Sequence, residues 1–201
     1  MNKQEIQKEI EHIVYLLGMK QVTRFGFERT ENDPTESVAE HVYGLFVLAK
    51  YFLPLVDPEH KLDWQKIYDM ILWHDTGEIE TGDIPMFQKT EQHDTEELQA
   101  LELVKDKSPK HLSVEIYNSA MHYETEDSQE RKFMKAIDKL ESAFSLRSNT
   151  VTAKMRFAKQ QVTHEMFVEA RTKACGSYPL LLEFGLEIGE YLKEHKTFCD
   201  Q

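Results

Sequence analysis

The chain has 201 residues, of which 40% are hydrophobic, so it can bury one substantial core, and its length predicts a single domain over residues 1–201. Its 24 basic and 36 acidic residues leave a net charge of −12, which disfavours a nucleic-acid polymer or an anionic membrane as a partner. A small anion held by a few well-placed cations remains possible.

Two further exclusions concern location. Cys175 and Cys199 are too few for a disulfide scaffold, and no start resembling a signal peptide precedes the first amphipathic segment, so we expect a cytoplasmic protein. No apolar run approaches the ~18 residues that span a bilayer, because residues 43–56 are interrupted by Lys50 and Pro54.

The spacing of apolar residues predicts an all-α fold. In residues 3–17 they recur every three or four positions, which is typical of an amphipathic helix, and Gly18 ends it. Residues 23–29 have no clear period and precede a turn at residues 31–34, so we expect an ordered loop there. Ser37 and Glu40 fit a capping box that opens a second helix running to Pro54.

Further helices are predicted downstream, and no segment reads as a convincing strand. One begins at Ser108-Pro109, with proline at the first helical position, and continues through Tyr123. The apolar content of residues 178–198 suggests an exposed subunit contact, so residues 151–201 are expected to serve as packing or dimer surface of a homodimer. The remaining expected helices, which bring the bundle to about eight, cover residues 62–76, 88–105, 127–146, 161–175 and 179–193.

His74 and Asp75 follow an apolar Met-Ile-Leu-Trp run, where an unpaired polar group would cost roughly 2–7 kcal/mol to bury. A divalent ion would compensate that cost. The break at Gly77 and Gly82 leaves two more acids, Glu78 and Asp83, on a loop beside the pair.

Two other polar residues lie in apolar helical stretches. His41 falls in the first turn of its helix, where the helix dipole favours the neutral imidazole that a metal needs, and Asp138 lies within an apolar stripe. Two imidazoles and two carboxylates form a mixed N/O set suited to Mn²⁺, Fe²⁺, Co²⁺, Ni²⁺ or Zn²⁺. Water on such an ion is more acidic than bulk water and can act as a nucleophile.

This pattern resembles the HD-domain metal-dependent phosphohydrolases, whose H…HD…D signature matches the four residues in order. Within that superfamily the chain is most similar to the bacterial 5′-deoxynucleotidases and their eukaryotic relatives. The similarity covers roughly residues 10–147. The motifs that carry it are Arg24, the Glu36-Ser37-Val38-Ala39-Glu40-His41 segment, the HD-x-x-E-x-x-x-G-D-I-x-P run from His74 to Pro85, and Asp138-Lys139.

The resemblance implies a metal-dependent hydrolase of (deoxy)nucleoside 5′-monophosphates. The metal ligands would be His41, His74, Asp75 and Asp138. Glu78 would act near the attacking water or the leaving group, while Arg24 and Asp83 would position phosphate and sugar. Phe25 replaces the Trp that the bacterial enzymes use to distinguish deoxyribose from ribose, and it lacks the indole N–H.

Alternatives remain open at this stage. His93 and His122 lie where two-metal HD proteins place extra histidines, although half-exposed positions are the more common reading, and His122 could line the substrate pocket. A phosphodiesterase or triphosphohydrolase would use the same metal set, but it would need more basic residues than Arg24, Arg29 and Lys139 provide. A non-catalytic nucleotide-binding protein could also retain the fold.

Overall fold

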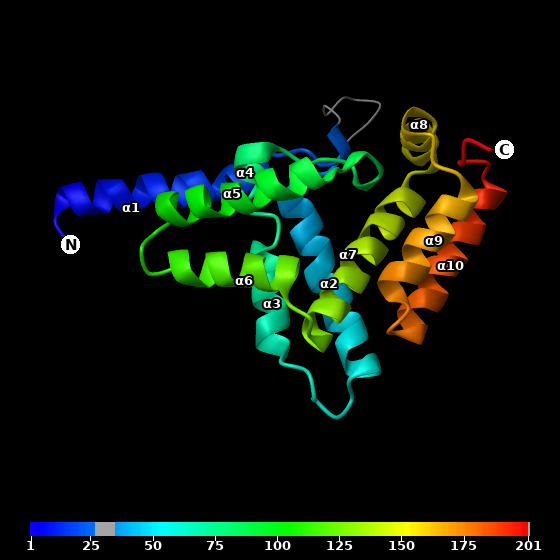
Figure 1. The fold of residues 1–201 in the computed structure, drawn as a ribbon, viewed down its shortest axis with the longest axis horizontal. Helices are drawn as coiled ribbons and strands as arrows, with labels where there is room; N and C mark the ends of the chain where they lie inside the picture. The colour runs from blue at the N-terminus through cyan, green and yellow to red at the C-terminus, as the bar shows by residue number, and fades with distance from the viewer. Residues whose placement is uncertain (27–34, 201) are drawn as a thin grey trace. The chain divides into compact units, whose positions relative to one another are not determined.

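The computed structural model describes residues 1–26 and 35–200, which form helices and connecting turns (Figure 1). Within these ranges no β-strand forms, and an isolated antiparallel bridge pairs Thr23 with Ser37. The all-α fold class is therefore confirmed. The turn predicted at residues 31–34, the end of the loop predicted at residues 23–29, and Arg29 lie outside the described residues.

The chain divides into two compact units, each assembled from segments distant in sequence. The first comprises Met1–Val42 and Tyr68–Glu126, and the second comprises Tyr43–Ile67 and Asp127–Gln201. Helices α2 (Val38–Val56) and α3 (Trp64–Trp73) contribute to both. The prediction of one domain over residues 1–201 stays a prediction.

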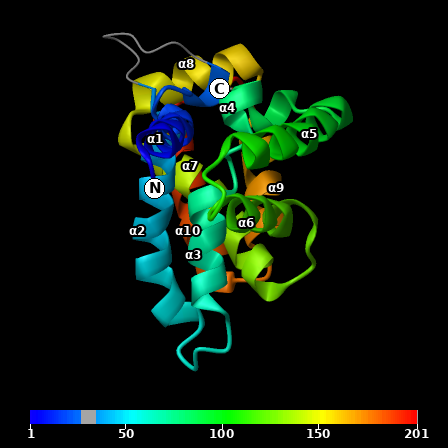
Figure 2. The same ribbon diagram turned by 90° about the vertical axis from the view of Figure 1, so that its left-hand side faces the viewer.

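In the first unit, α5 (Glu91–Lys107) packs against α6 (Ser113–Thr125) and α4 (Glu78–Thr81). Both views show α6 running beside α5 (Figures 1 and 2). The short α4 is also tied to α1 and α5: Tyr15 and Lys107 both donate to Oε1 of Glu80, at 2.6 and 2.7 Å. The elements confined to this unit are α1 (Lys3–Leu16), η1 (Leu17–Lys20), η2 (Arg24–Gly26), α4 (Glu78–Thr81), η3 (Met86–Gln88), α5 (Glu91–Lys107) and α6 (Ser113–Thr125).

The second unit is built on α7 (Gln129–Ser148), α9 (His164–Cys175) and α10 (Pro179–Glu194), which pack on one another, with α8 (Thr150–Gln160) between α7 and α9 in the chain. The Tyr178 hydroxyl, just after α9, donates to the carbonyl of Gln129 at the start of α7. The end of α9 therefore lies beside the start of α7, and these two helices run antiparallel. Fully buried side chains fill the core, among them Phe133, Met134, Phe167 and Leu181.

Three helix predictions need correction. The helix expected to open at Ser108-Pro109 begins at Ser113. Ser108 is the C-terminal cap of α5, and the carbonyl of Pro109 accepts a hydrogen bond from the Leu112 amide in a turn that precedes the helix. The helix expected over residues 62–76 is shorter, Trp64–Trp73. Helix α8 was not predicted; it begins where the Asn149 side chain accepts from the amide of Thr152.

One surface prediction is wrong, and one predicted apolar stripe lies in an unexpected environment. The C-terminal segment 178–198, expected to be exposed, buries Tyr178, Leu181, Leu192 and Phe198 in the core of the second unit. Conversely, α1 has the predicted apolar stripe, but that stripe is exposed and the helix contains no buried residue. Helical spacing identifies an apolar face but does not identify what covers it.

Helix α2 is longer and more apolar than the sequence reading allowed. An 18-residue window of this 19-residue helix has a mean hydropathy of 1.2, enough by length and composition alone to cross a membrane. A core helix of a folded domain passes the same test. Leu45, Ala49, Phe52 and Leu53 are all fully buried, as expected for such a core helix.

The turn between α2 and α3, in the second unit, is organised by one buried carboxylate. Asp57 accepts hydrogen bonds from the amides of Lys61 and Leu62 and, at 2.8 Å, from the indole of Trp64. Replacing Asp57 by Ala is expected to lower the free energy of unfolding by about 2–3 kcal/mol, because three part-buried hydrogen bonds lose their charged acceptor. Urea denaturation at neutral pH measures this change. As a control in the same turn, exposed Glu59→Ala should cost less than ~1 kcal/mol.

The same carboxylate predicts an acid dependence. Burial opposes ionisation of Asp57, but the hydrogen bonds from Trp64 and from the two amides outweigh it and lower its pKa. Because the folded pKa lies below the unfolded one, this stabilisation is present above roughly pH 4 and is lost as the pH falls through the folded pKa. In the Asp57→Ala protein, stability should fall less steeply with acid; an unchanged slope would contradict this role.

Candidate metal centre

The end of α3 brings His74 and Asp75 to the centre of the first unit. Met70 and Ile71 are fully buried and fix this end of the helix in the core. The His74 amide still donates to the Met70 carbonyl, but the helix ends at Trp73, where the Thr76 hydroxyl and amide both bond to the Trp73 carbonyl. His74 and Asp75 therefore leave the helix in a tight turn.

The second imidazole comes from the start of α2. The predicted capping box is confirmed: the Ser37 amide donates to the Glu40 carboxylate, and the Glu40 amide bonds to the Ser37 hydroxyl. This cap follows the bridge between Thr23 and Ser37. His41 consequently occupies the first turn of the helix, and its side chain is fully buried.

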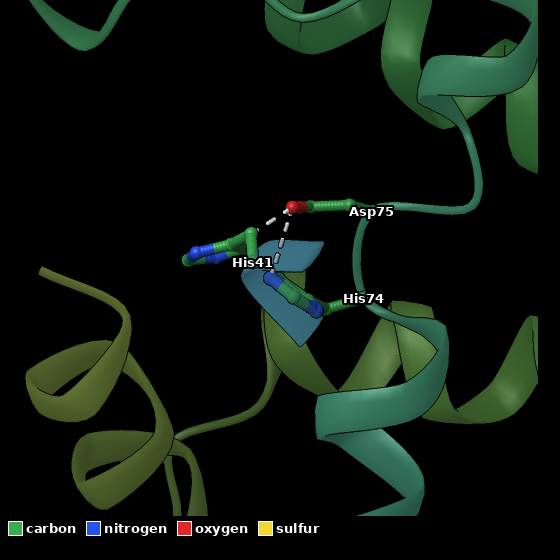
Figure 3. A group of neighbouring side chains, drawn as sticks. All are labelled: His41, His74 and Asp75. Carbon is green, nitrogen blue, oxygen red and sulfur yellow. Dashed lines mark ion pairs between the residues drawn. The ribbon is translucent and has the colours of Figure 1, made fainter. Parts of the chain in front are cut away.

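The three side chains converge (Figure 3). Nε2 of His74 lies 3.1 Å and Nε2 of His41 lies 4.0 Å from Oδ2 of Asp75, and the two ring centroids are 5.7 Å apart. One ligand atom from each residue falls within 4.8 Å of the others. Three of the four predicted ligands thus surround a common point; that they bind a metal stays a prediction.

The protonation of His74 suits a metal ligand. Its Nδ1 lies 3.2 Å from the carbonyl of Ile71, to which it can only donate, so the neutral ring carries its lone pair on Nε2. That Nε2 is buried, and no described residue hydrogen-bonds to it. In this tautomer the lone pair of Nε2 lies only 3.1 Å from the acceptor oxygen of Asp75, and a divalent cation shared by the two atoms fits that arrangement. The ring of Tyr123 packs edge-on against His74 at 4.8 Å.

Arg24 supplies the nearest positive charge. Its guanidinium lies 3.4 Å from Asp75, 3.5 Å from Glu36 and 3.9 Å from Asp83. Burial works to raise the pKa of Asp75, but the imidazoles of His74 and His41 and the guanidinium of Arg24 outweigh it and hold that pKa below its usual range. Asp75 is therefore ionised, as a metal ligand must be.

Phe25 and Asp83 form a second contact beside Arg24. Phe25 has a φ of 65°, in the left-handed region that non-glycine residues seldom adopt, and its amide donates to the Asp83 carboxylate. Burial raises the pKa of Asp83; the charge of Arg24 and this hydrogen bond oppose the rise, while Asp75 adds to it. The left-handed Phe25 thus holds a carboxylate close to the guanidinium.

Glu78 opens α4, one turn beyond Asp75. Burial raises the pKa of its carboxyl well above the ordinary value, the charges of Asp75 and Asp83 raise it further, and Arg24 only partly opposes them. Its Oε2 is buried without a hydrogen-bond partner among the described residues. The left-handed Gly82, with φ of 72°, ends α4 and turns the chain toward Asp83. The carboxyl of Glu78 therefore holds its proton more tightly than an ordinary glutamate does.

The remaining predicted residues belong to other helices. Asp138 belongs to α7 of the second unit, where it is 3% exposed and accepts from Nζ of Lys139 at 2.7 Å. His122 is half-buried on α6, one residue before Tyr123. His93 has a structural role: its Nδ1 accepts from the Thr90 amide and closes the capping box of α5. This bond occupies a nitrogen that a binuclear site would need.

Some contacts escaped the sequence reading. Tyr123 was predicted as part of a helix, and its ring contacts His74, a residue 49 positions earlier in the chain. The ion pair between Glu36 and Arg24 joins the same two segments as the β-bridge between Thr23 and Ser37. Glu36 was part of the quoted motif, but nothing in its local pattern identified its partner.

Comparison with known proteins agrees with this geometry. Residues 18–175 match the HD domain family. The 5′-deoxynucleotidase HDDC2 of Mus musculus is 32% identical over 126 residues, covering 61% of this chain and 60% of that protein. The Xenopus laevis 5′-deoxynucleotidase HDDC2 is 30% identical over 138 residues, or 67% and 66% of the two chains. The chain thus spans about 60 to 66% of the length of these curated relatives.

Solved structures share the fold. A protein of Magnetospirillum magnetotacticum, described as a predicted metal-dependent phosphohydrolase, superposes with a TM-score of 0.74 at 16% identity, over 98% of this chain and 99% of that one. A conserved hypothetical protein from Pyrococcus furiosus gives 0.64 at 21% identity, over 92% and 99%. At such identities the similarity concerns the fold alone.

Proposed function

Because the chain belongs to the HD domain family, we propose that it is a metal-dependent phosphohydrolase that removes the 5′-phosphate from (deoxy)nucleoside 5′-monophosphates. The observation that carries the proposal is the convergence of His41, His74 and Asp75, with the buried Nε2 of His74 lying 3.1 Å from the Asp75 carboxylate. The sequence similarity to 5′-deoxynucleotidases of several vertebrates supports the choice of substrate class.

The metal would be held by His41, His74 and Asp75 of the first unit, with Asp138 of the second unit as the fourth ligand. A divalent transition ion there, Mn²⁺, Co²⁺, Fe²⁺, Ni²⁺ or Zn²⁺, would supply a Lewis acid and an acidic water at neutral pH. The donor set suits these ions because it mixes imidazole nitrogen with carboxylate oxygen. The turn after α3 orients Asp75, and the Ile71 carbonyl orients His74.

Arg24 would bind the phosphate. Its planar guanidinium matches two phosphate oxygens, and it already lies 3.4 Å from the Asp75 carboxylate, beside the proposed metal ligands. Glu36 and Asp83 hold it in place. The phosphorus would therefore be placed next to the cluster without a large movement of this side chain.

Glu78 would manage the proton. Since burial and neighbouring acids raise the pKa of its carboxyl, Glu78 is suited to donate a proton to the leaving 5′-oxygen. Asp83, Phe25 and His122 would contact the sugar or line the pocket. Phe25 offers a ring face but no hydrogen-bond donor on its side chain, so we expect only weak discrimination between deoxyribose and ribose.

The direct test is a screen of purified protein for phosphate release from deoxynucleoside and nucleoside monophosphates in the presence of each candidate metal. We expect release with at least Mn²⁺ or Co²⁺, and none after chelation. Absence of release from every nucleoside monophosphate with every metal would refute the substrate class. Release from triphosphates or phosphodiesters in preference would favour the other HD-type hydrolases.

We also propose that the protein acts as a cytoplasmic homodimer, since twofold dimers are the commonest soluble oligomers. In the segment first expected to form the contact, residues 178–198, the side chains of Tyr178, Leu181, Leu192 and Phe198 are buried within the second unit and are not available to a partner. Sedimentation velocity should give about twice the chain mass of 23.6 kDa. A monomer at micromolar concentration would refute the dimer.

A further inference from the structure

Helix α2 presents a row of apolar residues to solvent within the second unit. Tyr43, Val47, Tyr51 and Leu55 are spaced four residues apart, so they form one ridge along the helix, which we call the α2 ridge. These residues are 73%, 49%, 56% and 53% exposed, whereas Leu45, on another side of the same helix, is fully buried. The fold of the described chain therefore leaves the α2 ridge largely uncovered.

The composition of this part of α2 is typical of an interface. Residues 43–56 contain no acidic residue, although the chain has 36, and Lys50 is the one basic residue among them. The centres of interfaces are depleted in charged residues and enriched in tyrosine. The exposed stripe of α1, by contrast, lies on a helix with two lysines and three glutamates, as is usual for a solvated helix. Of the two exposed stripes, the α2 ridge is the better candidate for a contact.

The exposed area of the α2 ridge suits the centre of a dimer interface. An aromatic side chain buries about 150–250 Å², so the two partly exposed tyrosines alone leave on the order of 250 Å² open. With Val47 and Leu55 the ridge reaches the ~300–600 Å² of the largest apolar patch on a typical monomer, which is often functional. A standard interface buries about 800 Å² per partner, so a polar rim around the ridge would complete it.

We propose that the α2 ridge is the contact between two copies of this chain, with α2 of one protomer packed against α2 of its partner. The inference rests on the homodimer proposed above and assigns its surface. Each copy has a net charge of −12, so two copies meet most favourably where acidic residues are absent, as they are here. A twofold contact brings the same patch of both copies together, and two such ridges interdigitate in the commonest class of helix packing. The same charge disfavours an anionic bilayer as the occupant.

The test is sedimentation velocity of the full chain over a range of concentrations, for the natural protein and for two variants. Val47→Glu places a carboxylate on the ridge of both copies, and glutamate is at least as good a helix former as valine. Ile13→Glu is the matched control, because Ile13 is an apolar residue of the α1 stripe with nearly the same exposure, 48% against 49%. Circular dichroism verifies that each variant folds.

We expect Val47→Glu to raise the dissociation constant of the dimer by about a hundredfold or more, because two like charges are buried in one contact, and Ile13→Glu to leave it unchanged. An unchanged dimer in Val47→Glu overturns the proposal; if that variant does not fold, Tyr43→Glu at the most exposed position of the ridge decides in the same way.

Two other results would also overturn the proposal. Dissociation caused by Ile13→Glu instead would assign the contact to the α1 stripe. A monomeric natural protein would refute the dimer altogether, and if that monomer bound phosphatidylcholine vesicles and Val47→Glu abolished the binding, the α2 ridge would be assigned to a lipid surface.

The interface and the hydrolase activity fail separately, because sedimentation reads the oligomeric state without substrate. A dimer that Val47→Glu dissociates, in a protein that releases no phosphate from nucleotides, would support the α2 contact and refute the proposed activity. Phosphate release by a protein whose dimer is unaffected by Val47→Glu would refute the α2 contact alone.

Discussion

Replacing His74 by alanine is expected to abolish tight metal binding and to reduce phosphate release by about a thousandfold or more. The magnitude follows because a Lewis-acidic ion contributes several kcal/mol to transition-state stabilisation, and each 1.4 kcal/mol corresponds to about tenfold in rate. His74 is central because its buried Nε2 faces the cluster, 3.1 Å from Oδ2 of Asp75. The measurement is metal content after dialysis, by atomic emission, together with the rate of hydrolysis.

His93→Ala is the matched control for this variant. His93 lies in the same unit but uses Nδ1 to cap α5, so its loss should leave metal content and activity unchanged apart from a small loss of stability. If the His74 variant retained a full equivalent of metal, the assignment of the centre would be wrong. If the His93 variant lost metal, the binuclear arrangement would be correct instead.

The second large effect is expected from Glu78→Gln, which should lower kcat by about 10²- to 10⁴-fold and leave metal content unchanged. The amide preserves the size of the side chain but cannot donate a proton as an acid does. Steady-state kinetics with the best substrate of the screen measures the loss. This variant also separates an enzyme from a binding protein, because a binding protein has no turnover to lose.

Glu80→Gln provides the comparison on the same short helix. Glu80 binds Tyr15 and Lys107 rather than the cluster, and glutamine keeps an acceptor for both donors. Its kcat should stay within about threefold of the natural value. Equal losses of kcat in the two variants would indicate that both substitutions merely disturb α4, and this would refute the role of Glu78 as an acid.

The sequence made the centre of the first unit predictable because of the energetics of burial. His41 and His74 stand in apolar helical stretches, where only a compensating partner makes a polar group stable, and both are buried in one cluster. The capping box at Ser37 is local and was also predictable. The left-handed Phe25 was not, because its conformation depends on the distant carboxylate of Asp83.

What the sequence could not give depends on contacts between distant segments. Helix α8 contains apolar residues, but its sequence does not show which face is covered, and only packing reveals that Ala153 and Phe157 are buried while Val151 and Met155 are exposed. The stripes of α1 and α10 have similar helical spacing, yet one is exposed and the other forms the core of the second unit. Proline 109 is compatible with a helix start as well as with the turn that it occupies. In each case local preference was satisfied by two arrangements and tertiary contacts selected one.

The central claim is that four side chains from distant parts of the chain bind one ion. A crystal structure of the Mn²⁺-loaded protein, with anomalous diffraction recorded at the manganese edge, tests it most directly. The account predicts one strong anomalous peak within about 2.0–2.3 Å of His41, His74, Asp75 and Asp138. A peak elsewhere, or a peak at the histidines with Asp138 beyond ligand distance, would contradict it.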